Sequence, residues 1–257
     1  MSGSSYLQAA AEAARITSAV ALGYYKRDPE QMVKADGTPV SIADLEAEKT
    51  ARAWIEKRFP EDGIVGEEFP TVREGAKRRW IVDPIDGTYT FLRGVPFWGT
   101  IVAVAEGDDV IAGAVCCSAI NEEISAAPGE GCWFNGSRCS VSSQTELAKA
   151  TLLTTDARFL RDESRRARWL TLQNAAGGMR TWGDCYGYIL VATGRADIMV
   201  DDAVSAWDAA ALMPIITEAG GTLTDWKGNA TPFGGDAIAT NGKLSEQVLA
   251  IMSGRKQ

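Results

Sequence analysis

The hydrophobic pattern changes about halfway along the chain, and this change most constrains the fold. Up to about residue 145, two helical patterns are followed only by short strand-like runs, whereas from about Ala150 strand and helix patterns alternate. Successive strands favour an antiparallel sheet, and alternation favours helices packed on the faces of a sheet. We therefore predict an α/β (α+β layered) fold with an N-terminal α+β half, 1–145, and a C-terminal α/β half, 146–257, which form one continuous body with a cleft between them.

The first half should contain two helices and a mostly antiparallel sheet. Apolar residues recur at near-helical spacing over 4–25 and again over 41–59, where Pro60 ends the pattern. The strand-like runs that follow are 63–65, 79–82, 98–105, 110–118 and 123–126. In the second half we predict strands at 151–155, 179–182, 196–200, 221–225 and 237–240, and helices at 162–176, 185–193, 207–219 and 244–253.

The chain of 257 residues contains no histidine, which limits the chemistry available to it. This absence excludes Ser-His-Asp triads, imidazole zinc sites and phosphohistidine intermediates. Carboxylates, hydroxyls, thiols and lysines are left as reactive groups. A chain of this length can bury roughly three quarters of its unfolded surface without disulfides or a structural metal.

Charge and apolar content indicate which partners are absent. The formal net charge is -8 and no basic stretch could follow a phosphate backbone, so we expect no nucleic-acid partner. No stretch of about 18 uncharged apolar residues occurs, so we expect no membrane span. The cysteines are odd in number and form no CxxC pair, which is typical of core thiols in a reducing compartment. We expect a cytoplasmic protein.

Three acidic segments stand where predicted strands end or helices begin, so their side chains can converge on the cleft. The predicted apolar strand before Asp83 places the Asp83 carboxylate at the end of that strand. Gly87 lets the chain turn so that Asp86 lies beside Asp83. Carboxylates this close repel each other unless a cation lies between them, and an all-oxygen ligand set favours Mg²⁺. Each segment alone would be interpreted as a solvated turn, but together they predict a metal site. The segments are GEE at 66–68, DPIDGT at 83–88 and WD at 207–208.

These motifs, together with the sequence WDAAALMPIITEAGG from Trp207, resemble the inositol monophosphatase superfamily of Mg²⁺-dependent, lithium-sensitive phosphatases. The resemblance runs from the segment 40–44 to the segment 239–242. It implies an alternating α-β-α-β-α sandwich of the inositol monophosphatase/fructose bisphosphatase type, an enzyme that hydrolyses a small-molecule phosphate monoester, and a homodimer.

Two further segments, FLRGVP at 91–96 and RTWGDCY at 180–186, look most like the histidinol-phosphate phosphatase branch of the superfamily. The pair Tyr89-Thr90 departs from that branch, in which a basic residue followed by Ser or Asn is common. The resemblance thus implies hydrolysis of L-histidinol phosphate in histidine biosynthesis. The alternatives are an inositol-1-monophosphatase or broader sugar phosphatase and, from another class, a regulatory protein-binding module.

The resemblance also implies roles for individual residues. A first Mg²⁺ would be held by Glu67, Asp83 and the carbonyl of Ile85, a second by Asp83, Asp86 and Asp208, and a third, weaker ion would touch Glu67. In the family a threonine and an aspartate orient the attacking water, and the matching residues are Thr88 and Asp44. The catalytic residues would be Asp44, Glu67 and Thr88, and the substrate-binding residues Asp86, Gly87, Thr88, Asp184, Asp201 and Asp208.

The leaving-group pocket is where the substrate would be selected. Asp201 matches a family acid that contacts the leaving group, and Asp184 stands where a small residue is usual. An extra carboxylate favours cationic histidinol over neutral inositol. Asp184 is alternatively the N-cap of the 185–193 helix. Trp98 and Trp182 could stack on an imidazole, although each would more often belong to the core.

Overall fold

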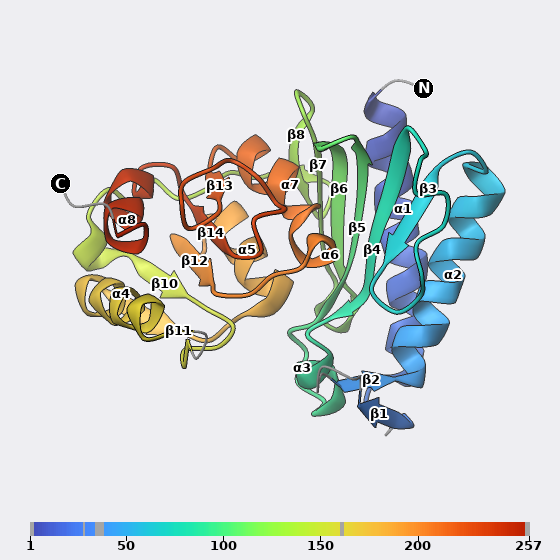
Figure 1. Ribbon diagram of the computed structural model, residues 1–257, viewed down its shortest axis with the longest axis horizontal. Helices are drawn as coiled ribbons and strands as arrows, with labels where there is room; N and C mark the ends of the chain where they lie inside the picture. Colours follow the sequence, from blue (N-terminus) through green and yellow to red (C-terminus); the bar gives the residue numbers. More distant parts are fainter. Residues whose placement is uncertain (1–2, 28, 34–38, 160–161, 255–257) are drawn as a thin grey trace.

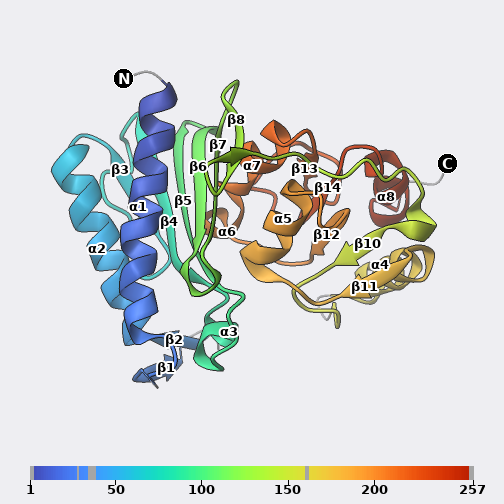
Figure 2. The same cartoon turned by 180° about the vertical axis from the view of Figure 1, so that it is seen from behind.

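The computed structural model describes residues 3–27, 29–33, 39–159 and 162–254. Secondary structure stacks in layers, in the order helices, sheet, helices, sheet, helices (Figure 1, and Figure 2 from behind). This arrangement confirms the predicted α/β layered fold and its α-β-α-β-α order. Within these ranges no helix is both long enough and apolar enough to cross a membrane.

The larger sheet has seven strands in sequence order and is mostly antiparallel, as predicted. Only β3 and β4 run parallel to each other. Its last hairpin was not predicted, although Asn135 and Gly136 form its two-residue turn with φ values of 45° and 77°. The strands are β3 (Gly63–Gly66), β4 (Arg78–Asp86), β5 (Gly99–Glu106), β6 (Asp109–Cys117), β7 (Glu122–Ala127), β8 (Gly131–Phe134) and β9 (Ser137–Arg138).

Two predicted helices, α1 (Gly3–Tyr24) and α2 (Ile42–Arg58), cover the outer face of this sheet (Figure 1). The small buried side chains of Ala10, Ala13 and Ala14 let α1 pack closely against the strands. A capping box starts α2, because Asp44 accepts from the backbone N–H of Ser41 at 2.8 Å. The same cap therefore fixes the place of a predicted catalytic residue.

Two small elements lie at the end of the larger sheet near the acidic segments. Strands β1 (Gln31–Val33) and β2 (Pro39–Ser41) form an antiparallel pair. The short helix α3 (Thr88–Leu92) follows the DPIDG turn and contacts β2. Gly87 is the N-cap of this helix, and its left-handed backbone conformation, with φ of 84°, makes the turn into it.

The second sheet is mixed, in the order β11-β10-β12-β14-β13. Strand β10 is parallel to both of its neighbours, whereas β14 is antiparallel to both of its own. The strands are β10 (Thr151–Leu153), β11 (Gly178–Arg180), β12 (Ile198–Asp201), β13 (Thr222–Thr224) and β14 (Ala237–Thr240). Short 3-10 turns occur at Ser118–Ile120 and Leu147–Lys149.

Helices cover both faces of the second sheet. The middle layer, between the two sheets, contains α5 (Asp184–Ala192), α6 (Ala206–Ala209) and α7 (Leu212–Glu218). The outer layer contains α4 (Glu163–Ala175) and α8 (Ser245–Met252), which contact each other. The apolar core between the sheets draws on both halves of the chain, for example Ile101, Met199 and Ile215. The division at residue 145 stays a prediction.

The single helix predicted over 207–219 is wrong, because the chain forms α6 and α7 with a turn at Ala210 and Ala211. Pro214 has no N–H to donate to the carbonyl of Ala210, so a continuous helix would lose this hydrogen bond. The turn packs closely on β6, since a Cβ at Gly113 would lie 2.3 Å from the carbonyl oxygen of Ala211. The break thus aims the short α6 at the sheet that carries the other acidic segments.

Candidate active site

Asp83 and Asp86 lie at the end of β4, where its pairing with β5 shifts register. Asp83 Oδ1 accepts from the N–H of Ile85 at 3.0 Å, which bends the backbone around Pro84. The hydroxyl of Thr100 donates to the Pro84 carbonyl at 2.7 Å and holds the bend against β5. The irregular strand end therefore turns both carboxylates toward the middle layer.

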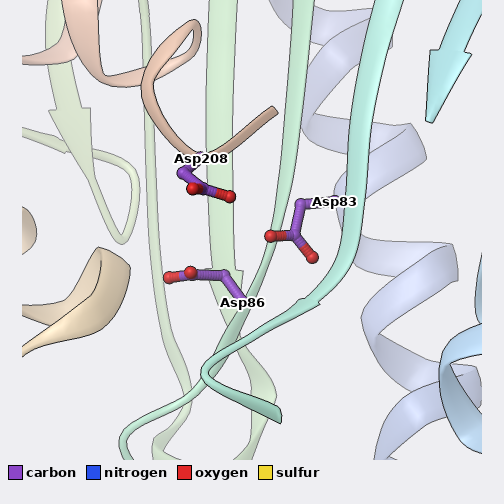
Figure 3. A group of neighbouring side chains, drawn as sticks. All are labelled: Asp83, Asp86 and Asp208. Carbon is purple, nitrogen blue, oxygen red and sulfur yellow. The ribbon is translucent and has the colours of Figure 1, made fainter. Parts of the chain in front are cut away.

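Asp208 reaches the same place from α6, on the opposite side. It is the third residue of a capping box, and its Oδ2 accepts from the N–H of Ser205 at 2.7 Å. Figure 3 shows the carboxylates of Asp83, Asp86 and Asp208 around one common space. One oxygen from each of them lies within 4.8 Å of the others. The structure thus brings together three predicted ligands from two distant segments.

Burial and mutual repulsion make this cluster costly when it is ionised. Burial, followed by the charges of Glu67 and Asp86, raises the pKa of Asp83 well above its usual value. Burial and then the charge of Asp184 do the same for the pKa of Asp86. Burial raises the pKa of Asp208 to about 6, although the Ser205 N–H opposes this shift. A divalent cation would remove the repulsion, and these oxygen ligands are those that Mg²⁺ prefers.

Glu67 borders the cluster from the loop after β3. Its N–H donates to the Val82 carbonyl at 3.2 Å, directly before Asp83 on the neighbouring strand. Its charge contributes to the raised pKa of Asp83, Asp44 and Asp208, so it faces the same space. The Ile85 carbonyl, the other predicted ligand, lies 3.0 Å from the Thr88 hydroxyl.

Asp44 and Thr88, the predicted water-orienting pair, are in contact. The Thr88 hydroxyl lies 3.2 Å from Asp44 Oδ1, whereas Oδ2 of Asp44 accepts from the hydroxyl and N–H of Ser41. Asp44 is fully buried, and burial raises its pKa although these hydrogen bonds oppose the shift. The single Thr88 proton can go to Asp44 or to Ile85, but not to both.

Asp184 is not an N-cap, so that interpretation of its role is wrong. The cap is Gly183, and Asp184 is the first residue of α5, with an unusual positive φ of 52°. Its N–H donates to the Thr155 hydroxyl at 2.8 Å, and its carboxylate accepts from the Thr90 hydroxyl at 3.2 Å. Gly87, with φ of 84°, makes room, because a Cβ there would lie 2.8 Å from Asp184 Oδ2. Burial and the charge of Asp201 raise the pKa of Asp184 to about 7.

Asp201 lies at the end of β12 and is buried with both carboxylate oxygens occupied. The Tyr188 hydroxyl and the Thr155 N–H each donate to it at 2.9 Å. A small cavity of about 80 Å³ joins it to the cluster, with Asp86, Asp184 and Asp208 among its lining residues. The predicted leaving-group acid therefore borders the same cavity as two of the predicted metal ligands, Asp86 and Asp208.

A larger cavity of about 570 Å³ opens outward from Asp184. Tyr89, Phe97 and Asp156 are among its lining residues, which gives it aromatic and acidic groups. Trp98 is fully buried against Phe91, so it belongs to the core, as the sequence favoured, and cannot stack on a ligand. The side chain of Trp182 is exposed, and its stacking role stays a prediction.

Several residues that shape the site were not predicted. The N–H of Cys185 donates to Asp86, and Thr90, Thr155 and Tyr188 hold the carboxylates of the leaving-group pocket. Each of these contacts joins distant segments, so no local pattern in the sequence indicates it. Only the fold brings the partners together.

Fold and site together define a layered α/β protein with a buried acidic centre suited to divalent cations. The family model for the inositol monophosphatase family matches residues 3–257. The chain therefore belongs to the inositol monophosphatase family, whose members are metal-dependent phosphatases.

Individual relatives agree with this assignment. The histidinol-phosphatase of Chlorobaculum parvum is 39% identical over 248 residues, which cover 96% of each chain. The histidinol-phosphatase of Mycobacterium tuberculosis is 40% identical over 225 residues, or 86% of each chain. Among solved structures, an inositol monophosphatase from Zymomonas mobilis superposes with a TM-score of 0.88 at 30% identity, covering 98% of this chain and 99% of the other.

Proposed function

We propose that this phosphatase hydrolyses L-histidinol phosphate to L-histidinol and inorganic phosphate with Mg²⁺, as a step of histidine biosynthesis. The observation that carries the proposal is the carboxylate of Asp184, held by Thr90 between the acidic cluster and the outer cavity. Histidinol carries a positive charge that this carboxylate can pair with, whereas inositol is neutral. Two histidinol-phosphatases among the relatives support the same substrate.

The proposed ligands would hold two to three Mg²⁺ ions. Glu67, Asp83 and the Ile85 carbonyl would form one site, Asp83, Asp86 and Asp208 a second, and Glu67 would touch a weaker third. Bound Mg²⁺ supplies Lewis acidity, which lowers the pKa of a water molecule and neutralises the leaving oxygen. The buried, mutually repelling carboxylates support this assignment.

Asp44 and Thr88 would orient the attacking water. With its proton on Asp44, the Thr88 hydroxyl still has lone pairs that accept a hydrogen bond from water. This arrangement also leaves the Ile85 carbonyl free of the Thr88 proton. Asp44 is fixed by Ser41 at the start of α2, so the pair is already ordered before substrate binds.

The remaining proposed residues would hold the substrate. Gly87 and Thr88 would contact the phosphate. Asp86 and Asp208 would face the ester oxygen that links the phosphorus to the leaving group. Asp184 would pair with the cationic part of the leaving group, with Asp201 behind it. Tyr188 and Thr155 fix Asp201, so this acid would act from a set position.

The deciding experiment compares phosphate release from L-histidinol phosphate and from inositol 1-phosphate, as kcat/KM on one preparation with Mg²⁺. We expect a preference of about a hundredfold for histidinol phosphate, which corresponds to about 2.7 kcal/mol in transition-state binding. Equal values or the reverse preference would favour an inositol-1-monophosphatase or a broader sugar phosphatase.

We further propose a cytoplasmic homodimer in which residues 1–145 and 146–257 form one body with the site between them. All five cysteines are free thiols, as a reducing compartment would keep them. Sizing chromatography combined with light scattering tests the dimer. A monomer at micromolar concentration would contradict it.

A further inference from the structure

One buried carboxylate, Glu48, has no part in the roles proposed so far. It lies one turn after Asp44 on α2, and its side chain is 0% exposed. Oε1 of Glu48 accepts from Nε of Arg52 at 2.7 Å, so the charge is paired. A buried ion pair is weak evidence for stability, because desolvation opposes the attraction between the charges. Its other contacts therefore indicate what it does.

Both Glu48 and Arg52 also contact the backbone of the loop that follows β3. The second oxygen of Glu48 accepts from the N–H of Glu68 at 2.7 Å. The guanidinium of Arg52 donates to the carbonyls of Phe69 at 2.8 Å and of Pro70 at 3.1 Å. The ion pair thus binds both donors and acceptors of the loop backbone.

The loop approaches α2 so closely that a side chain is excluded at Gly66. A Cβ built on Gly66 would lie 1.9 Å from Oε1 of Glu48. The backbone of Gly66 has no positive φ, so the close approach, and not the backbone conformation, is what requires a glycine here. Figure 1 shows α2 beside β3, the strand from which this loop leaves.

The backbone on both sides of Glu67 is consequently held by hydrogen bonds. Its own N–H donates to the Val82 carbonyl at 3.2 Å, and the next N–H, that of Glu68, donates to Glu48. Two anchored peptides therefore flank a side chain whose charge acts on Asp83 and Asp208.

We propose that Glu48, held by Arg52, is a positioning residue that sets the carboxylate of Glu67 toward the metal site. The inference rests on the ligand role of Glu67 in the proposed function. It extends that function to a pair of residues on α2 that touches neither ion nor substrate. Such supporting contacts typically change metal affinity by about 10–100-fold when they are removed.

The test measures Mn²⁺ binding without substrate, by the electron paramagnetic resonance signal of the unbound ion. We expect Glu48→Gln and Arg52→Lys each to raise the Mn²⁺ Kd about tenfold. Arg52→Lys removes the two loop contacts while it keeps the charge, and it carries the test if Glu48→Gln does not fold. Glu46→Gln is the matched control, since Glu46 lies on the same helix in an exposed pair with Lys49; its Kd should not change.

Two readouts separate positioning from general damage. The double variant Glu48→Gln/Glu67→Gln should bind Mn²⁺ no more weakly than Glu67→Gln alone, because both changes act through one ligand. The kcat of Glu48→Gln should recover when Mg²⁺ is raised to saturation, which damage to the fold would not allow. An unchanged Kd in both single variants, or additive losses in the double variant, would overturn the inference.

The proposed function fails in a different way. If Glu67→Gln kept the affinity of the unmodified protein, Glu67 would not be a ligand, and the positioning role would fall with it. The comparison of histidinol phosphate with inositol 1-phosphate would still decide the substrate.

Discussion

The hydroxyl of Thr88 lies 3.2 Å from Oδ1 of Asp44, although 44 residues separate them in the chain. One residue opens α3 and the other lies in the first turn of α2. Two short local structures, a turn and a helix cap, therefore meet beside the acidic cluster. In the proposed mechanism this meeting would supply a hydroxyl and a carboxylate that orient water, in a chain that contains no histidine.

Removing the Thr88 hydroxyl should lower kcat far more than it raises KM. Thr88→Ala takes away the group that would accept from the attacking water, and a positioned proton-transfer group contributes about 10²–10⁴-fold. Steady-state rates with saturating Mg²⁺ measure the effect. Thr88→Ser, which keeps a hydroxyl, should recover much of the rate, and an equal loss in both variants would contradict the role.

Asp83→Asn should abolish turnover, because Asp83 is the ligand proposed to be shared by two ions. We expect Mg²⁺ to raise the thermal unfolding midpoint of the unmodified protein, and Asp83→Asn should remove this rise. Differential scanning fluorimetry with and without Mg²⁺ measures this rise. Near-normal turnover in Asp83→Asn would refute the metal assignment.

Asp184→Asn should raise KM for histidinol phosphate by about 10- to 100-fold, since a hydrogen bond to a charged group contributes about 1.5–3 kcal/mol. The KM for inositol 1-phosphate should change little, because its leaving group, inositol, is neutral. The second substrate is thus the control within one variant. Equal changes for both substrates would mean that Asp184 only shapes the pocket.

Stability of the metal-free protein should depend on pH through the acidic cluster. The pKa values of Asp83 and Asp86 lie well above the usual 3.8, and those of Asp208 and Asp184 lie at about 6 and about 7. The folded state therefore holds protons that the unfolded chain has lost. This stabilisation is complete below the unfolded pKa and is lost as the pH rises through 6 and 7.

Protons and Mg²⁺ compete for the same carboxylates. The rise in unfolding midpoint on adding Mg²⁺ should therefore be larger at pH 8, where the carboxylates are ionised, than at pH 5. Unfolding in EDTA and in Mg²⁺ across this range measures it. A larger effect of Mg²⁺ at pH 5 would mean that the folded cluster does not hold the extra protons.

Gly113→Ala should destabilise the protein by about 1–3 kcal/mol, as overpacking a core typically does. The added Cβ would meet the backbone of Ala211 at the turn between α6 and α7. Denaturant unfolding measures the loss. Gly75→Ala is the control, because a Cβ there meets nothing within 4 Å.

Local patterns predicted most of the helices, most strands and the three acidic segments, because each depends on residues close together in the chain. The break before Pro214 and the turn at Asn135 and Gly136 were also visible locally, yet they were not predicted. The contact of Thr90 with Asp184 spans 94 residues and that of Cys185 with Asp86 spans 99, so only the packed layers define them. The same holds for the burial of Trp98, which depends on the aromatic neighbours around it.

Asp83 and Asp86 lie at the end of strand β4 in one sheet, whereas Asp208 comes from a helix in the neighbouring layer. An ion held by all three would cross-link two layers of the fold that come from separate stretches of sequence. At a free ion concentration of 100 times its Kd, this binding would add about 2.7 kcal/mol to the free energy of unfolding. The supply of magnesium in the cell would then set how stably the two layers are joined, as well as how fast the substrate is consumed.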